Sequence, residues 1–238
     1  MSVIAIEATA ASKEPPEIPS FLELEIAQFC QLKCAHCYSE SGPHGGRGTM
    51  TAGDWRRVMD QAAALGTETV QFIGGEPTLD ADMPALAQYA LHIGLNVDIY
   101  TNLVHVTPDM WDLFTRPGVS VGFSWYSADP GKHAEVTSSR ASYGRTKANI
   151  RGAVRRGVRL RAGLVEVVYG QGIDAAMDEP HAAWLAGKAA HPASRWYPVI
   201  ASVPRHTFVP RWWVRVAPAL SGTTHGNCAT VPPNRTRG

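Results

Sequence analysis

Three cysteines lie close together near the start of this 238-residue chain, in the run Cys30-Gln-Leu-Lys-Cys34-Ala-His-Cys37. The run directly follows an apolar, alternating segment, residues 21–27, that is typical of a β-strand. Three thiolates at this spacing can each bind one iron of a cubane 4Fe-4S cluster, whereas a fully protein-ligated cluster takes four cysteines. The fourth iron would keep an open position for a small molecule, as catalytic metal sites do. The spacing therefore predicts a catalytic metal site rather than a structural one.

Two other interpretations of these cysteines remain open. Cys34 and Cys37 have the spacing of a zinc knuckle, and His36 or His44 could complete the ligand set. Structural zinc sites usually combine two separated ligand pairs, however, and no second pair follows in the sequence. A dithiol redox site would need only Cys34 and Cys37 and would leave Cys30 without a role. The cluster interpretation uses all three thiols.

A second motif, Gly74-Gly-Glu-Pro77, closes the next predicted strand, residues 69–73. With the CxxxCxxC run before it, the chain resembles the radical S-adenosylmethionine (radical SAM) superfamily. Residues 97–102 and 119–124 look like the third and fourth strands of that family, which end in Thr-Asn and in a serine. The resemblance runs from about Glu23 to Val168. Two motifs in the expected order are far more specific than one.

The resemblance implies both cofactors and their binding residues. In the family, SAM chelates the open iron, and electron transfer into its sulfonium releases a 5′-deoxyadenosyl radical. We therefore expect a 4Fe-4S cluster on Cys30, Cys34 and Cys37, with SAM as the second cofactor. The implied SAM-binding positions are Gly74, Gly75, Glu76, Pro77, Asn102, Ser124 and His36. No catalytic side chain is predicted.

Each SAM-binding position has a physical rationale and a plainer alternative. The two glycines would let the backbone approach the ligand, and Glu76 would accept from its ammonium group. A Gly-Gly-Glu-Pro run is also an ordinary strand-exit turn. His36 would pack near the adenine or simply within its own loop. Asn102 and Ser124 lie at strand ends that would face the ligand, but Asn and Ser are also common turn residues.

Strand-like runs alternate with helix-like runs, which is typical of parallel βαβ units. Strands are predicted at residues 22–27, 69–73, 97–101, 119–125 and 158–168. Helices are predicted from Thr51 or Asp54 to Gly66, and at residues 82–93, 107–114 and 143–156. The fold class is therefore α/β, and the resemblance implies a partial (β/α)6 TIM-like barrel of the radical SAM type, incomplete at its C-terminus. All four motifs lie at the strand C-terminal ends, the working face of such a barrel.

Length and composition favour one enzyme core. A chain of 238 residues that is 45% hydrophobic buries one sizeable core. We divide it into an N-terminal extension, residues 1–20, a radical SAM core, residues 21–170, and a tail, residues 171–238. Neither a cationic start before an apolar run nor 18 consecutive apolar residues occur, so no membrane association is expected. Thiolate ligands need a reducing compartment, which predicts a cytoplasmic protein.

The wider resemblance, particularly residues 37–45, is to radical SAM maturases of ribosomally made peptides. It implies a precursor peptide as substrate and an electron donor such as a flavodoxin or ferredoxin as partner, with no nucleic acid. Abstraction of hydrogen from a peptide residue would then produce a cross-link or related product. A radical SAM step in cofactor biosynthesis is the alternative among enzymes. Outside enzymes, the alternative is a non-catalytic module that binds a metal or a leader peptide.

The tail has a different composition from the core. Seven of the 22 Lys and Arg residues lie at or beyond Pro180, whereas all 21 Asp and Glu residues lie before it. A basic, aromatic tail could bind an acidic leader peptide or nucleic acid. A GC-rich gene read out of frame would give the same composition, and we favour that interpretation. The family's cysteine-rich SPASM domain would then have no counterpart, since Cys228 alone cannot hold a cluster, and this chain would be truncated or inactive.

We expect the DNA downstream of the Val168 codon, translated in the other two frames, to encode a further βα unit followed by clustered cysteines. Limited proteolysis should also remove the tail and spare the core, because unpacked segments are cut first. If neither frame encodes clustered cysteines and the tail resists protease, the tail is a folded element of this protein.

Overall fold

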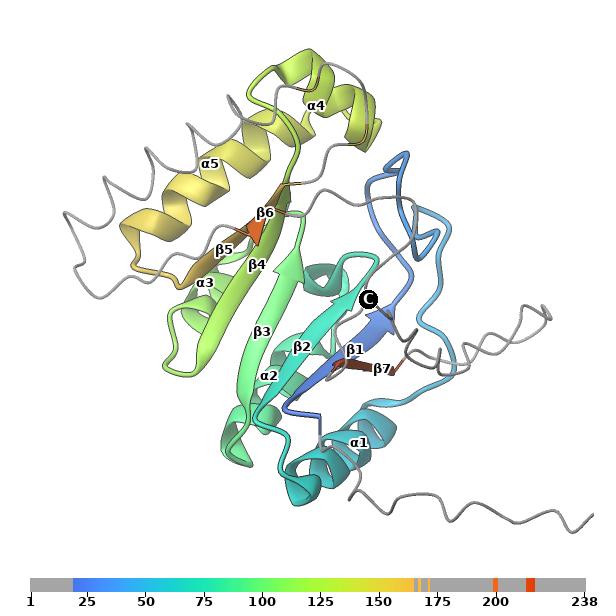
Figure 1. Cartoon of the computed structure of the whole chain (residues 1–238), viewed down its shortest axis with the longest axis vertical. Coiled ribbons are helices and arrows are strands. Elements are labelled where there is room, and N and C mark those ends of the chain that lie inside the picture. Colours follow the sequence, from blue (N-terminus) through green and yellow to red (C-terminus); the bar gives the residue numbers. More distant parts are fainter. Residues whose placement is uncertain (1–18, 165–166, 168–170, 172–198, 201–212, 217–238) are drawn as a thin grey trace, which may run out of the picture.

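The computed structural model describes residues 19–164, 167, 171, 199–200 and 213–216, and in these residues parallel strands alternate with helices through most of the sequence (Figure 1). The strands are β1 (Phe21–Ala27), β2 (Thr69–Gly74), β3 (Asn96–Thr101), β4 (Val119–Trp125), β5 (Leu160–Leu164), β6 (Val199–Ile200) and β7 (Trp213–Val216). The helices are α1 (Ala52–Leu65), the 3-10 turn η1 (Pro77–Leu79), α2 (Met83–His92), α3 (Pro108–Phe114), α4 (Pro130–Thr137) and α5 (Ser142–Arg155). The predicted α/β class is confirmed.

The strands form one sheet in the order β6-β5-β4-β3-β2-β1-β7, with every pair parallel. No pairing joins β6 to β7 in the part of the chain that the structure describes, so the sheet is open rather than a closed barrel. Figure 1 shows α2 and α3 behind the sheet, with α1 beside β1 and α5 beside β5. The described helices include none with the length and apolar character that crossing a membrane requires.

Local sequence signals explain where the helices begin and end. Thr51 caps α1 by accepting from the backbone N–H of Asp54 at 3.2 Å, while Asp54 accepts from the N–H of Thr51 at 2.7 Å. Gly66 ends the helix in the left-handed conformation, with φ 95°. Both ends agree with the sequence prediction. The prediction missed α4, although its Asp129 cap and Pro130 at the first helical position are ordinary start signals.

The two faces of the sheet differ in polarity. Side chains such as Leu24, Phe72 and Phe123 are fully buried between the sheet and the helices. Many of the alternate positions are polar, and four of them are aligned in register across neighbouring strands, namely Glu23, Gln71, Asp98 and Ser120. Because side chains alternate along a strand, this register places the four on the inner face, away from the helices.

Asp98 is the centre of the inner face. Its carboxylate accepts from Gln71, from Ser120 at 2.7 Å and from the guanidinium of Arg161 at 2.7 Å. The Arg161 guanidinium also lies 5.3 Å from the centre of the Tyr100 ring. Tyr100 lies across β4 and β5, and glycines at positions 122 and 163 leave space for its ring. The inner face is therefore held by a buried polar network rather than by apolar packing.

Two short strands come from the region assigned to the tail. β6 pairs with β5 on one edge, and β7 pairs with β1 on the other, with Glu23 opposite Arg215. The predicted fifth strand, residues 158–168, is observed as β5 up to Leu164, and most of its remainder lies outside the described residues. Both the division at residues 20 and 170 and the frame-shifted origin of the tail stay predictions.

The contact between Tyr100 and Gly163 generates a test of this packing. A Cβ at Gly163 would lie 2.5 Å from the Tyr100 hydroxyl, so Gly163→Ala should destabilise the fold by about 1–3 kcal/mol in urea unfolding. Adding Tyr100→Phe should restore part of the loss. Gly144→Ala is the matched control, because a Cβ there meets nothing within 4 Å. Equal stability of the Gly163 and Gly144 variants would contradict this account.

Candidate functional site

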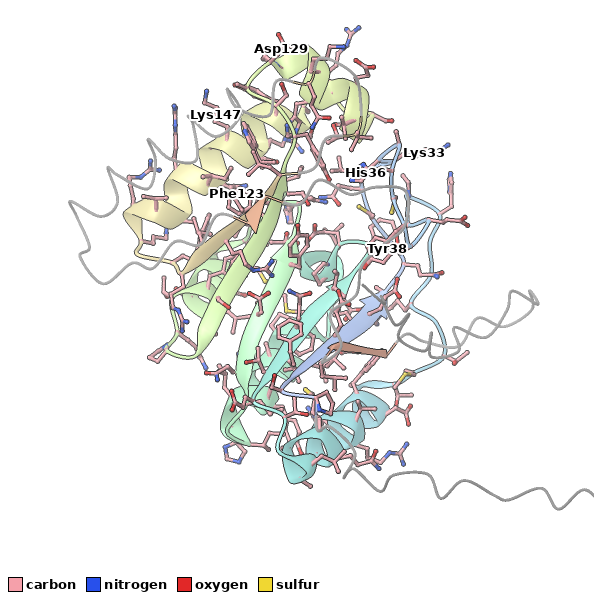
Figure 2. All side chains as sticks on the ribbon, in the orientation of Figure 1. Lys33, His36, Tyr38, Phe123, Asp129 and Lys147 are labelled. Carbon is pink, nitrogen blue, oxygen red and sulfur yellow. The ribbon has the colours of Figure 1, made fainter. Side chains whose placement is uncertain are left out.

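Most of the predicted site residues gather at the carboxyl ends of the parallel strands. The cysteine loop follows β1, the Gly-Gly-Glu-Pro run follows β2, and Asn102 follows β3 directly. Ser124 lies one residue before the end of β4. Figure 2 shows Lys33, His36 and Tyr38 of the cysteine loop beyond the ends of the central strands. The sheet topology therefore brings together motifs that are about one hundred residues apart in the sequence.

The cysteine loop is closed at its base by backbone hydrogen bonds. The N–H of Gln28 donates to Gly46 at 2.8 Å, and the N–H of Cys30 donates to Gly42 at 3.0 Å. Farther out, the N–H of Ala35 donates to Val136 of α4 at 2.9 Å. Cys30 is 8% exposed, and Cys34 and Cys37 are partly buried. The loop thus holds three thiols in one partly enclosed region at the edge of the sheet.

Burial disfavours the thiolate form of Cys30 and Cys34. It raises the pKa of Cys30 to about 12 and that of Cys34 to about 11, although the N–H of Leu32 and the hydroxyl of Tyr126 partly counteract it. A redox CxxC site needs a lowered thiol pKa, so the raised value at Cys34 speaks against that alternative. A bound metal deprotonates its thiol ligands outright. The donor set therefore fits ligation of a metal centre.

The zinc alternative gains no support from the arrangement of side chains. Across the described residues, no three His, Cys, Asp or Glu side chains are placed to hold a single metal ion. A cubane cluster spreads its thiolate ligands over different irons instead of gathering them on one.

Gly74 and Gly75 pack closely against the backbone of residues 27–29. A Cβ at Gly74 would lie 2.1 Å from the carbonyl oxygen of Ala27, and one at Gly75 would lie 2.1 Å from that of Phe29. Gly45 approaches Gln28 just as closely. The N–H of Gly75 donates to the oxygen of Ala27 at 2.7 Å. These glycines bring the loop after β2 against the base of the cysteine loop, and contact of their backbone with SAM stays a prediction.

Glu76 is a buried carboxylate, 1% exposed, that links strand ends. Its Oε1 accepts from the hydroxyls of Thr78 at 2.7 Å and Thr101 at 2.6 Å. Its Oε2 accepts from the N–H of Asn102 at 2.8 Å. Burial raises the pKa of Glu76, and these bonds oppose the rise. Both oxygens are thus engaged within the protein, and contact with a SAM ammonium group stays a prediction.

Asn102 and Gln31 form a reciprocal amide pair. Asn102 Nδ2 donates to Gln31 Oε1 at 3.1 Å, and Gln31 Nε2 donates to Asn102 Oδ1 at 3.1 Å. Asn102 Nδ2 also lies 3.7 Å from the sulfur of Cys30. Asn102 therefore contacts the cysteine loop. Sequence reasoning missed Gln31, because a Gln between two cysteines carries no signal of its own.

Ser124 and His36 belong to neighbouring contacts. The hydroxyl of Ser124 lies 3.0 Å from that of Tyr100, which connects the strand end to the inner face. The His36 ring lies edge-on to Tyr126, with centroids 5.1 Å apart, and burial lowers its pKa. Tyr126 in turn contacts the buried ring of His133 at 5.5 Å. Aromatic packing thus joins the cysteine loop to α4, and a SAM contact of Ser124 or His36 stays a prediction.

Arg47 and Asp80 form a second connection that the sequence did not reveal. The Arg47 guanidinium donates twice to the carboxylate of Asp80, at 2.8 and 2.7 Å, and once to Asp82 at 2.8 Å. They border an open hollow of about 260 Å³, lined by Ala27, Phe29, Gly45, Arg47, Glu76, Leu79, Asp80 and Ala81. None of the three clustered cysteines lines this hollow. We therefore do not assign SAM to it.

A three-cysteine loop beside a Gly-Gly-Glu-Pro loop, at the carboxyl edge of a parallel sheet, defines a class of α/β proteins built to hold a metal cluster. The model of the radical SAM superfamily matches residues 24–182. The chain belongs to the radical SAM superfamily. The match continues past Val168, where the sequence resemblance was expected to end.

Several named proteins are similar to the chain. A PqqA peptide cyclase of Xanthomonas campestris is 30% identical over 155 residues, which are 65% of this chain and 41% of the relative. An Fe-coproporphyrin III synthase of Methanosarcina barkeri is 33% identical over 100 residues, 42% of this chain and 25% of the relative. The chain thus spans less than half the length of these relatives.

Solved structures confirm the fold. Streptococcus suis SuiB bound to S-adenosylmethionine superposes with a TM-score of 0.61 at 20% identity, covering 79% of this chain and 42% of SuiB. The structure of anSMEcpe with bound AdoMet gives a TM-score of 0.51 at 15% identity, covering 61% of this chain and 43% of that protein. The partial TIM-like barrel expected from the sequence is therefore the observed fold type, here with an open sheet. Membership of the family implies SAM and an iron-sulfur cluster as cofactors.

The close backbone contacts of Gly75 predict that a larger residue there destabilises the protein. Gly75→Ala would force a Cβ into the Phe29 carbonyl, next to Cys30, and should destabilise the protein by about 3 kcal/mol and lower its iron content. Gly42→Ala is the control, because a Cβ there meets nothing within 4 Å. Thermal unfolding and iron analysis after anaerobic reconstitution measure both effects. If the Gly75→Ala protein keeps wild-type stability and iron content, the Gly-Gly-Glu-Pro run is an ordinary turn.

Proposed function

We propose that Cys30, Cys34 and Cys37 hold a 4Fe-4S cluster whose open iron binds SAM, and that the protein abstracts hydrogen from a substrate. The observation that carries the proposal is the joining of the three-cysteine loop to the Gly-Gly-Glu-Pro loop by backbone contacts. When bound, the cluster supplies one electron to SAM, and SAM supplies the radical. The chain's own residues hold the three thiols, shape the loop around them and limit their contact with water.

The proposed SAM site lies where the cysteine loop meets the ends of β2, β3 and β4. Gly74, Gly75, Glu76 and Pro77 would contact SAM there, the glycines through backbone groups and Glu76 through its carboxylate to the ammonium group. His36 and Ser124 would border the nucleoside. Positioning of this kind matters because the sulfonium must lie close to the cluster for electron transfer. No residue of the chain is assigned to proton transfer.

The proposed substrate is a ribosomally made peptide. PqqA peptide cyclases are the support from sequence, and SuiB bound to its precursor peptide SuiA is the support from fold. A flavodoxin or ferredoxin would deliver the electron. A reducing compartment, the cytoplasm, suits thiolate ligands.

A cofactor-building reaction is the second candidate. The observation that favours it is the similarity to an Fe-coproporphyrin III synthase over 100 residues. That match spans 42% of this chain and 25% of the synthase, and a shared fold does not by itself select the substrate. A small precursor-peptide gene beside this one would decide for peptide maturation, and its product would lose hydrogen in mass spectrometry when incubated with the enzyme.

Replacing Cys30, Cys34 or Cys37 singly with Ala should abolish cluster absorbance and SAM cleavage, because a cubane held by only two cysteines loses ligation of one more iron. Cys228→Ala is the matched control and should retain both, since that cysteine lies outside the family match. The measurements are iron and sulfide content and 5′-deoxyadenosine formation under anaerobic, reducing conditions. Full iron retention by the Cys34→Ala protein would overturn the ligand assignment.

A further inference from the structure

Asn102 is held from several directions by elements that surround the site. Its N–H donates to Glu76 at 2.8 Å, and its carbonyl accepts from the hydroxyl of Thr146 on α5 at 2.9 Å. Its side-chain Oδ1 accepts from the N–H of Val104 at 2.9 Å. The position and orientation of this residue are therefore set by the Gly-Gly-Glu-Pro loop, by α5 and by its own loop.

These contacts decide which way the Asn102 amide points. The N–H of Val104 is a donor only, so the atom facing it must be the oxygen. Nδ2 is then directed toward the cysteine loop, where it meets Gln31 Oε1 at 3.1 Å and the sulfur of Cys30 at 3.7 Å. An Asn side chain has two N–H donors and two acceptor positions. Gln31, Cys30 and Val104 contact all four of these positions.

The sulfur of Cys30 is the acceptor that Asn102 Nδ2 faces. It is buried, and it also accepts from the backbone N–H of Leu32 at 3.4 Å. When this sulfur is a thiolate, both contacts become hydrogen bonds to a charged acceptor, which are stronger than bonds between neutral groups. Hydrogen bonds to cysteine sulfurs are among the factors that set the reduction potential of an iron-sulfur cluster.

We propose that Asn102, oriented by Gln31, is a positioning residue that donates a hydrogen bond to the Cys30 thiolate and thereby raises the reduction potential of the cluster. This inference rests on the proposed function, because it requires the cluster on Cys30. The bond withdraws electron density from sulfur and favours the reduced state. Partners outside the ligand set tune a metal centre in this way, and their loss is felt even though all ligands remain.

The test is the midpoint potential of the reconstituted full-length protein without SAM, followed by electron paramagnetic resonance during redox titration. Asn102→Leu removes the donor at similar side-chain volume and should lower the midpoint potential while iron content stays near that of the wild type. Gln31→Leu should give a smaller shift in the same direction, because the donor remains but loses its partner. Asn102→Asp retains the oxygen that Val104 contacts and should also lower the potential.

Asn149→Leu is the matched control. Asn149 Nδ2 donates to the carbonyl of Leu103 at 2.8 Å, so this variant loses an amide hydrogen bond to the same loop without touching a sulfur. An unchanged potential in both Asn102 variants, or an equal shift in Asn149→Leu, would overturn the inference. Loss of iron from both Asn102 variants would also overturn it, by showing a purely structural role. A wild-type protein that binds no cluster would instead refute the proposed function.

Discussion

The close backbone contact between the segments that leave β1 and β2 is the constraint on which the site depends. Gly74 and Gly75 lie so close to Ala27 and Phe29 that no side chain fits between them, and Gly45 approaches Gln28 from the returning part of the loop. The backbone of residues 27–29, which leads from β1 to Cys30, is therefore packed against these three glycines. Because these contacts involve backbone atoms, a larger residue cannot be accommodated by a change of rotamer.

Buried polar groups extend this contact across the sheet. Glu76 would be costly to bury alone, but hydrogen bonds from Thr78, Thr101 and Asn102 compensate for lost hydration. Asn102 then reaches back to the cysteine loop through Gln31. The result is a continuous chain of hydrogen bonds from the end of β2 through the end of β3 to the first thiol. Each member depends on its neighbours, so effects of substitutions here should be non-additive.

The comparisons identify the family of the core but not the substrate of the chain. The radical SAM match covers residues 24–182, which is enough to define the core. The chain spans only 41% of a PqqA peptide cyclase, so the similarity does not identify the substrate of this chain. The backbone of β7 pairs with β1, so part of the region assigned to the tail is a strand of the sheet. Proteolysis of the tail therefore distinguishes a tail that adds strands to the sheet from one that is read out of frame.

The sequence by itself determined the fold class and the motifs. Alternating strand patterns, the Thr51 cap and Gly66 identified β1 and α1, and cysteine spacing identified the three thiol ligands of the proposal, because these signals are local in the chain. Tertiary structure decided what the motif residues contact. The packing of Gly75 on Phe29 and the pairing of Asn102 with Gln31, 71 residues apart, arise only when the parallel strands are placed side by side. Sequence spacing carries no information about such contacts, since they depend on strand order and register.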